Sequence, residues 1–234
     1  MSIPRIIHQT WKSDRLPERF RIFQESWRLH HPSWEYRFYN DEACRRFVVE
    51  AFPDLVPIYD QCPHAVQRAD IFRYLVVARE GGLYADMDTE CVQPVDQLLE
   101  SRHAVFGVED LLSSHRARRL NLRHRERIAN FIFAAEASHP IFGEIEASLG
   151  ALPGPWDMQE EVLETTGPGM LTDVVQDHRV SMDLTVLPRL AWAAADWRYW
   201  RVIPRSDRLF VRHHFAGTWK DSRGAVVQEP AAGA

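Results

Sequence analysis

The stretch RADIFRYLVVAREGGLYADMDTE, residues 68–90, determines how the fold of this chain is interpreted. Apolar side chains recur at helical spacing through its first half, at Ala69, Phe72, Leu75 and Val76. The pair Gly81 and Gly82 then ends the predicted helix like a C-terminal cap. The following GLYADMDTECV predicts a short strand that runs into a loop and carries two carboxylates, Asp86 and Asp88. The stretch therefore predicts a helix that leads through a sharp turn into an acidic segment.

The segments before this stretch alternate between strand and helix patterns. RIIHQTW (5–11) and EYRFYN (35–40) predict strands. Residues 16–32 and 41–52 predict helices, the second with Asp41 as its N-cap. This order predicts an α/β domain with a parallel or mixed sheet.

The remainder of the chain continues this mixture. Strands or extended segments are predicted at 103–110, 127–135, 183–188 and 208–219, and helices at 139–149 and within 166–179. We expect one domain over residues 1–225, with 226–234 as a loose tail.

Composition excludes several classes of protein. The chain has 234 residues, 45% of them hydrophobic and 26% charged, which is ordinary for a globular protein. A net charge of −5 argues against a nucleic-acid partner. Cys44, Cys62 and Cys91 show no CxxC spacing, which favours a reducing compartment over a disulfide framework or a zinc site. No secretory signal or bilayer-spanning run is recognised, so we expect a cytoplasmic protein without a transmembrane segment, with peripheral membrane contact left open.

The two carboxylates of the acidic segment suit a metal ion. In an extended segment, Asp86 and Asp88 would share one face while Met87 points into the core. Carboxylate oxygens bind Mg²⁺ or Mn²⁺, and substrate phosphates commonly complete the coordination. A solvated loop is the alternative. Asp70 and Arg73 lie three residues apart on the preceding helix and form either a surface ion pair or part of the same site.

Three segments together carry a family resemblance: IPRIIHQTW (3–11), SWRLHHPSWEYRFYND (26–41) and residues 68–90. They resemble the glycosyltransferases with a DxD sugar-binding region, classed as glycosyltransferase family 32. This family includes outer-chain α-mannosyltransferases and capsular polysaccharide sugar transferases. The resemblance is strongest over about the first hundred residues, with weaker pieces at NFIFAAEASHP, TTGPGMLTD and HHFAGTW.

The resemblance implies a GT-A fold, a single Rossmann-like α/β domain whose mixed sheet is flanked by helices. It implies a metal-dependent hexosyltransferase that acts with retention, with a UDP- or GDP-sugar donor, Mn²⁺ or Mg²⁺, and a glycan, lipid-linked or protein acceptor. By similarity, Asp88 is the more direct metal ligand, while Asp86 contacts the ribose or sugar and reaches the metal. Asp70 and Arg73 hold donor hydroxyls, and Arg73 also steadies the leaving oxygens. No protein nucleophile is evident, which favours attack on the leaving-group face.

Five further residues are candidates for the site. Trp11 could stack on the nucleotide base, and Asn130 could line the donor or acceptor pocket. The Trp219 indole N–H could contact the leaving group. His213 and His214 are candidate metal or phosphate ligands, but neighbouring side chains on a strand face opposite ways, so we expect only one to reach the site. Core packing is the alternative for Trp11, and a buried amide for Asn130.

Three questions remain open at this level. The chain could be a degenerate, non-catalytic sugar-nucleotide-binding fold. A DxD phosphatase is a further alternative, which Glu90 after the acidic motif disfavours. The arginine-rich residues 113–127 form either a solvated loop or an arm over an anionic substrate.

Overall fold

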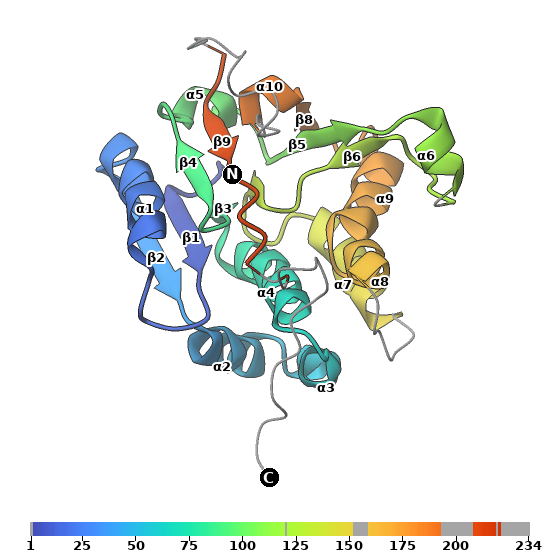
Figure 1. Ribbon diagram of the computed structural model, residues 1–234, viewed down its shortest axis with the longest axis horizontal. Helices are drawn as coiled ribbons and strands as arrows, with labels where there is room; N and C mark the ends of the chain where they lie inside the picture. The colour runs from blue at the N-terminus through green and yellow to red at the C-terminus, as the bar shows by residue number, and fades with distance from the viewer. Residues whose placement is uncertain (1, 120, 152–158, 193–207, 219, 221–234) are drawn as a thin grey trace.

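The computed structural model describes residues 2–119, 121–151, 159–192, 208–218 and 220. Within them the chain forms a mixed β-sheet covered by helices on both faces (Figure 1). The expected tail, 226–234, and Trp219 lie outside the described residues. In this part of the chain, no helix combines the length and apolarity needed to cross a bilayer.

The main sheet has the strand order β2-β1-β3-β7-β5-β6, with β8 paired to β5. Its strands are β1 (Ile6–Thr10), β2 (Glu35–Tyr39), β3 (Gly82–Ala85), β5 (Ala104–Leu111), β6 (Glu126–Ile128), β7 (Ile132–Ala135) and β8 (Thr185–Leu187). The pairs β1–β2, β1–β3 and β5–β8 are parallel, whereas β7 is antiparallel to both β3 and β5. The predicted mixed sheet is therefore confirmed.

A second, two-stranded sheet joins distant parts of the chain. Strand β4 (Thr89–Cys91) follows the acidic segment and pairs antiparallel with β9 (Val211–His213). Helix α1 (Glu18–His30) packs against β4, where the Trp27 indole donates to the Thr89 carbonyl over 3.1 Å. Figure 1 shows β9 lying beside β4, so the late strand is held next to the acidic motif.

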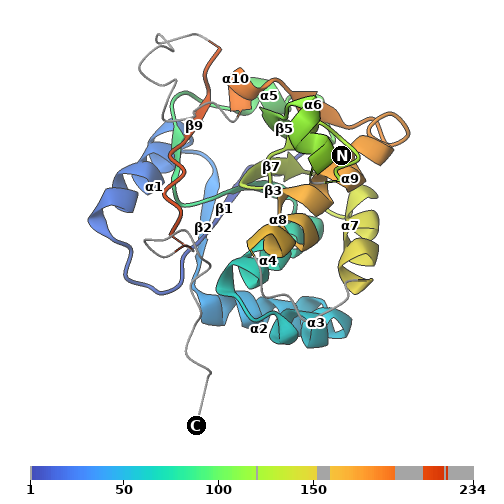
Figure 2. The same cartoon turned by 45° about the vertical axis from the view of Figure 1, so that its right-hand side comes forward.

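Helices cover the two faces of the sheet as separate layers. One face carries α2 (Asp41–Ala51), α3 (Val56–Gln61), α4 (Ala65–Glu80), α7 (Ile141–Gly150) and α9 (Pro168–His178). The other carries α1, α5 (Asp96–Leu99) and α10 (Arg189–Trp192). Figure 2 shows α2, α3 and α4 below the strands, with α7 to their right. Helix α8 (Gln159–Thr165) packs against α9. The short α6 (Ser114–Arg119) follows β5, and a 3₁₀ turn, Pro53–Leu55, precedes α3.

Alternation along the strands divides the core between these layers. In β3, the Tyr84 ring packs with the α4 layer, while Leu83 and Ala85 pack with α1 and α10. Successive strand side chains point to opposite faces, so each strand contributes to both cores. At the end of β3, the chain therefore leaves the sheet between the two helical layers.

Helix α4 is more deeply buried than its sequence pattern predicts. Its apolar spacing suggested one buried face, but it packs against α2, α3, α7 and the sheet, and Asp70 and Arg73 are buried with it. The surface-ion-pair alternative for these two residues is therefore wrong. The predicted glycine turn is confirmed, because Gly81 and Gly82 have φ of 67° and 99°.

Two local predictions are corrected. The N-cap of α2 is Asn40 rather than Asp41, since the Asn40 side chain accepts a hydrogen bond from the Ala43 amide over 2.8 Å. The predicted strand 127–135 is divided into β6 and β7, and Asn130 lies in the break between them. The break turns the chain from one edge of β5 to the other, because β6 and β7 flank that strand.

Candidate active site

The candidate site lies at the edge of the sheet where β1 and β3 end. A pocket of about 560 Å³ opens there, between the strand ends and the N-terminal half of α4. The predicted residues that line it are Trp11, Asp70, Arg73, Asp86, Asp88, Asn130 and His213. The fold thus gathers residues from five separate places along the chain into one cavity.

The acidic motif forms a turn rather than an extended strand. β3 ends at Ala85, and the Thr89 amide and hydroxyl both donate to the Asp86 carbonyl, over 3.0 and 2.6 Å. The expected extended geometry is therefore wrong, although Asp86 and Asp88 still come together on one side. Met87 is buried against Leu16 and Phe20, as predicted. The turn points Met87 into the core and leaves both carboxylates facing the pocket.

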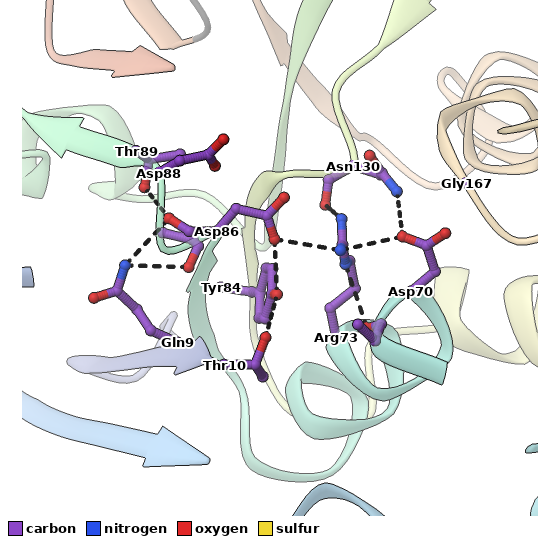
Figure 3. A network of polar contacts seen from close by, with 12 residues as sticks. Gln9, Thr10, Asp70, Arg73, Tyr84, Asp86, Asp88, Thr89, Asn130 and Gly167 are labelled. Carbon is purple, nitrogen blue, oxygen red and sulfur yellow. Dashed lines mark hydrogen bonds and ion pairs between the residues drawn. The ribbon is translucent and has the colours of Figure 1, made fainter. Parts of the chain in front are cut away.

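Arg73 links two carboxylates at the centre of the site (Figure 3). Its Nη2 lies 3.1 Å from Asp70 Oδ1 and 3.3 Å from Asp86 Oδ1, and its Nη1 donates to the Asn130 carbonyl over 3.0 Å. The side chains of Arg73 and Asp70 are 6% and 4% exposed, so this cation has little access to water. Buried charges of this kind need such partners, and the pairing holds the guanidinium in one orientation.

Neutral donors complete the environment of Asp70. The Asn130 amide donates to Oδ1 over 2.9 Å, and the Thr166 hydroxyl donates to Oδ2 over 3.0 Å. Burial raises the pKa of Asp70, while Arg73 acts against this increase. Both carboxylate oxygens therefore have partners from elements far apart in the sequence.

The hydroxyl groups of Tyr84 and Thr10 form a hydrogen-bonded chain that ends at Asp86. The sequence analysis predicted neither residue as part of the site. The Tyr84 hydroxyl donates to Asp86 Oδ1 over 2.8 Å and lies 3.0 Å from the Thr10 hydroxyl. The Arg73 guanidinium carbon lies 5.0 Å from the centre of the Tyr84 ring. The one signal in the sequence was that residues 84 and 86 are two apart at a strand end, where side chains share a face.

Asp88 is held by the C-terminal segment. His213 Nε2 lies 3.1 Å from Asp88 Oδ1, and the Ala216 amide donates to Oδ2 over 2.8 Å. Burial acts to raise the pKa of Asp88, but His213 and the amide outweigh it and hold that pKa below its usual value. The imidazole stacks on Phe131, with ring centres 3.8 Å apart. Asp88 is therefore a partly buried carboxylate whose two oxygens are both held by the C-terminal segment.

The ligand atoms of Asp86, Asp88 and His213 lie within 4.8 Å of one another. Two carboxylate oxygens and one imidazole nitrogen form a donor set that fits a divalent cation. His213 Nδ1 is buried and has no hydrogen-bond partner among the described residues. The chemistry of these three side chains thus matches the cation that the sequence predicted.

The second histidine of the pair points elsewhere. His214 Nε2 lies 2.9 Å from Glu90 Oε2, and its ring stacks on Phe23 at 4.1 Å between centres. Of the two histidines, His213 lines the pocket and His214 does not, as the strand alternation predicted, and the assignment of His214 as a metal ligand does not agree with this geometry. The alternation of side chains at the end of β9 separates the two rings.

The far end of the pocket contains buried polar atoms without partners in the described part of the chain. They are the Trp11 indole nitrogen and both ring nitrogens of His64. The Gln67 amide nitrogen is likewise buried without a partner among the described residues, but Gln67 does not line the pocket. Trp11 and His64 line the pocket, beside the first turn of α4. Sequence reasoning missed His64 and Gln67, because nothing in their spacing distinguishes them from ordinary helix-start residues.

The arginine-rich segment 113–127 contributes no described residue to the pocket lining. Arg123 pairs with Asp177 at 2.7 Å, and Arg127 pairs with Glu164 at 2.8 Å. Some of these arginines therefore bind carboxylates of α8 and α9 instead of facing the site.

Comparison with known sequences agrees with the motifs. Residues 17–104 match the glycosyltransferase sugar-binding region containing the DXD motif. The chain is 28% identical to inositol phosphoceramide mannosyltransferase 3 of Schizosaccharomyces pombe, over 97% of this chain and 58% of that protein. It is 26% identical to the initiation-specific alpha-1,6-mannosyltransferase of the same organism, over 94% and 64%. The chain thus spans less than two thirds of each of these relatives.

Solved structures agree with the architecture. The ligand-free glycosyltransferase domain of the YGT toxin superposes with a TM-score of 0.54 at 9% identity, covering 82% of this chain and 81% of that domain. The PaToxG glycosyltransferase gives 0.50 at 18% identity, covering 78% and 72%. The chain has the GT-A fold of glycosyltransferases. Its residues 17–104 match the DXD-containing sugar-binding region of the family that the sequence resembles.

Proposed function

We propose that this chain transfers a sugar from a nucleotide-sugar donor to a hydroxyl group of an acceptor. The observation that carries the proposal is the meeting of a three-ligand cation site with the buried Arg73 network in one pocket. Asp86 belongs to both, since it is one of the cation ligands and also pairs with Arg73. A nucleotide sugar needs both features, because its diphosphate binds a cation and its sugar carries hydroxyls.

Asp86, Asp88 and His213 are the residues that would hold the cation. When bound, the cation supplies Lewis-acid stabilisation of the negative charge on the leaving diphosphate. Mg²⁺ prefers all-oxygen ligands, so the imidazole favours Mn²⁺ of the two expected metals. The Ala216 amide and the packing on Phe131 hold Asp88 and His213 in place before the donor arrives.

Arg73 provides a fixed positive charge beside the cation ligands. Asp70, Asp86 and the Asn130 carbonyl hold its guanidinium, so little reorganisation is needed when charge develops on the leaving group. Asp70 and Asn130 line the same pocket and suit hydrogen bonds from donor sugar hydroxyls. Retention of configuration, which the family resemblance implies, remains part of this proposal.

The nucleotide is proposed to bind at the end of the pocket formed by Trp11 and His64. An indole ring can stack on any base, which is worth about 1–3 kcal/mol per base. The nitrogens of Trp11 and His64, which have no partner among the described residues, can hydrogen-bond a base or ribose. Uridine and guanosine nucleotides both suit this chemistry.

Mannose is the sugar to test first, because both relatives compared above are named as mannosyltransferases. Their names differ in the acceptor, and the first refers to inositol phosphoceramide. The acceptor of this chain is therefore proposed only as a glycan, a lipid-linked glycan or lipid, or a protein.

The test incubates the purified protein with Mn²⁺ and a panel of UDP- and GDP-sugars that includes GDP-mannose, and measures released nucleotide. Methyl and p-nitrophenyl mannosides are supplied as acceptors, with water as the default acceptor. Release that depends on Mn²⁺ and is lost in Asp88→Asn would support the proposal. Absence of both release and Mn²⁺-dependent nucleotide binding by calorimetry would instead favour a non-catalytic fold.

A further inference from the structure

Glu109 is the extra residue of a β-bulge in β5. Val108 pairs with Ile128 and Asp110 pairs with Arg127, so β5 advances by two residues where β6 advances by one. Glu109 is therefore left without a partner residue in the β5–β6 register. Bulges bend a strand and redirect a side chain, and they are frequent beside active sites. The Glu109 side chain lines the same pocket as the acidic motif. The bulge therefore delivers a further carboxylate to the site.

One oxygen of this carboxylate has no partner in the described part of the chain. Its Oε2 is buried and has no hydrogen-bond partner within the described residues. The charged neighbours are paired elsewhere, since Arg127 binds Glu164 at 2.8 Å and Arg189 binds Asp110 at 3.4 Å. Burial raises the pKa of Glu109, while Arg127 and His213 act against this increase. A buried carboxylate oxygen without a donor is costly, and a bound hydroxyl would satisfy it.

The position of Glu109 follows from the strand order β1-β3-β7-β5. Gly82 of β3 and Ala104 of β5 both pair with Ala135 of β7, so the two strands are level and run the same way. Asp86 follows the end of β3, and Glu109 lies near the end of β5. Two strand spacings separate these strands, about 10 Å. That spacing leaves room for a sugar between the acidic motif and Glu109.

The site residues form a row along this sheet edge. Trp11 follows β1, Asp86 and Asp88 follow β3, Asn130 precedes β7, and Glu109 ends the row on β5. A donor whose base lies at Trp11 and whose diphosphate lies at the acidic motif has its sugar toward Asn130. With the donor placed in this way, the next position along the row, that of Glu109, lies on the side of the acceptor.

We infer that Glu109 binds the acceptor, by receiving a hydrogen bond from an acceptor hydroxyl at Oε2. This inference rests on the proposed function and adds a residue that contacts the second substrate. Asp110 is the matched comparison, since it is the adjacent carboxylate, pairs with Arg189 and does not line the pocket.

The experiment compares Glu109→Gln with Asp110→Asn, using the donor that the panel identifies and p-nitrophenyl α-mannoside or water as acceptor. We expect Glu109→Gln to lower kcat/KM for the acceptor at least about tenfold, the loss typical of a hydrogen bond to a charged group. Its dissociation constant for nucleotide with Mn²⁺ should stay within about twofold of the wild type, which also reports correct folding. Asp110→Asn should match the wild type in both, and Glu109→Asp should recover part of the loss.

Three results would overturn the inference. The first is an unchanged kcat/KM for the acceptor in Glu109→Gln. The second is an equal loss of nucleotide affinity, which would place Glu109 on the donor side. The third is a sugar covalently bound to Glu109 in a peptide map of enzyme incubated with donor, which would make it a nucleophile. If the wild-type protein neither binds nucleotide nor releases it, the proposed function has failed, a result distinct from all three.

Discussion

Asp88 and His213 are 125 residues apart in the sequence, yet Oδ1 of one lies 3.1 Å from Nε2 of the other. Pairing of β4 with β9 places Thr89 opposite His213 and brings the imidazole to the acidic motif. The donor set for a cation is therefore complete only when the C-terminal strand is docked. Because His213 belongs to this donor set and His214 does not, substituting each histidine in turn tests the cation site.

His213→Ala should weaken Mn²⁺ binding at least about tenfold, because it removes an imidazole from the ligand set. His214→Ala is the matched control and should leave the affinity within about twofold, since His214 binds Glu90 and stacks on Phe23. Calorimetric titration with Mn²⁺ measures both. Equal losses in the two variants would contradict the assignment of His213.

Arg73→Ala should lower the free energy of unfolding by about 3–5 kcal/mol, because Asp70 and Asp86 lose the cation that compensates their burial. Arg45→Ala is the control and should leave the free energy of unfolding close to that of the wild type, since its pair with Asp60 is exposed. Denaturant unfolding gives both values.

Arg73→Lys keeps the positive charge but changes its geometry. In this variant, turnover should fall more than nucleotide affinity. Loss of nucleotide affinity alone would exclude a role for Arg73 at the leaving group.

Stability should depend on pH through His8. Its ring is buried, with Nε2 2.9 Å from the Gly81 carbonyl, and burial lowers its pKa from 6.5 to about 4. Between these values the unfolded chain binds more protons, so this contribution to stability is present above pH 6.5 and is lost as the pH falls toward 4. The loss amounts to about 3 kcal/mol by pH 4. Unfolding of wild type and His8→Asn across this range should give curves that converge on acidification; parallel curves would show that His8 is not responsible.

Gly82→Ala should destabilise the fold by roughly 2 kcal/mol or more. Gly82 has φ of 99°, and an added Cβ would lie 2.7 Å from the Ile6 carbonyl oxygen of β1. Gly143→Ala is the control in helix α7, where an added Cβ meets no atom within 4 Å, and it should stabilise by up to about 1 kcal/mol. Thermal unfolding of the two variants should show shifts of opposite sign. A neutral Gly82→Ala would mean that the turn tolerates a side chain.

Local patterns predicted the elements that depend on local chemistry. The helix over residues 65–80, its glycine turn and the inward Met87 follow from apolar spacing and from the freedom of glycine at positive φ. Predictions failed where neighbouring segments decided the outcome. The hydrogen bonds of Thr89 fold the acidic motif into a turn, and packing on all sides buries the pair of Asp70 and Arg73.

Glu109 shows most clearly what a linear pattern cannot supply. Within its predicted strand it was one acidic residue beside another, and the sequence showed no reason to prefer it to Asp110. The bulge against β6 directs it into the pocket, and a bulge depends on how two strands pair.

The sequence by itself determined the α/β alternation, the acidic motif and the resemblance of its first hundred residues to a DXD sugar-binding region, because these depend on residue type and short-range spacing. Only the tertiary structure decided which histidine reaches Asp88, that Arg73 links Asp70 to Asp86, and that Glu109 ends the row of site residues. Each of these is a contact between residues distant along the chain. Such contacts form only when strand order and register bring the ends of separate elements to one edge of the sheet.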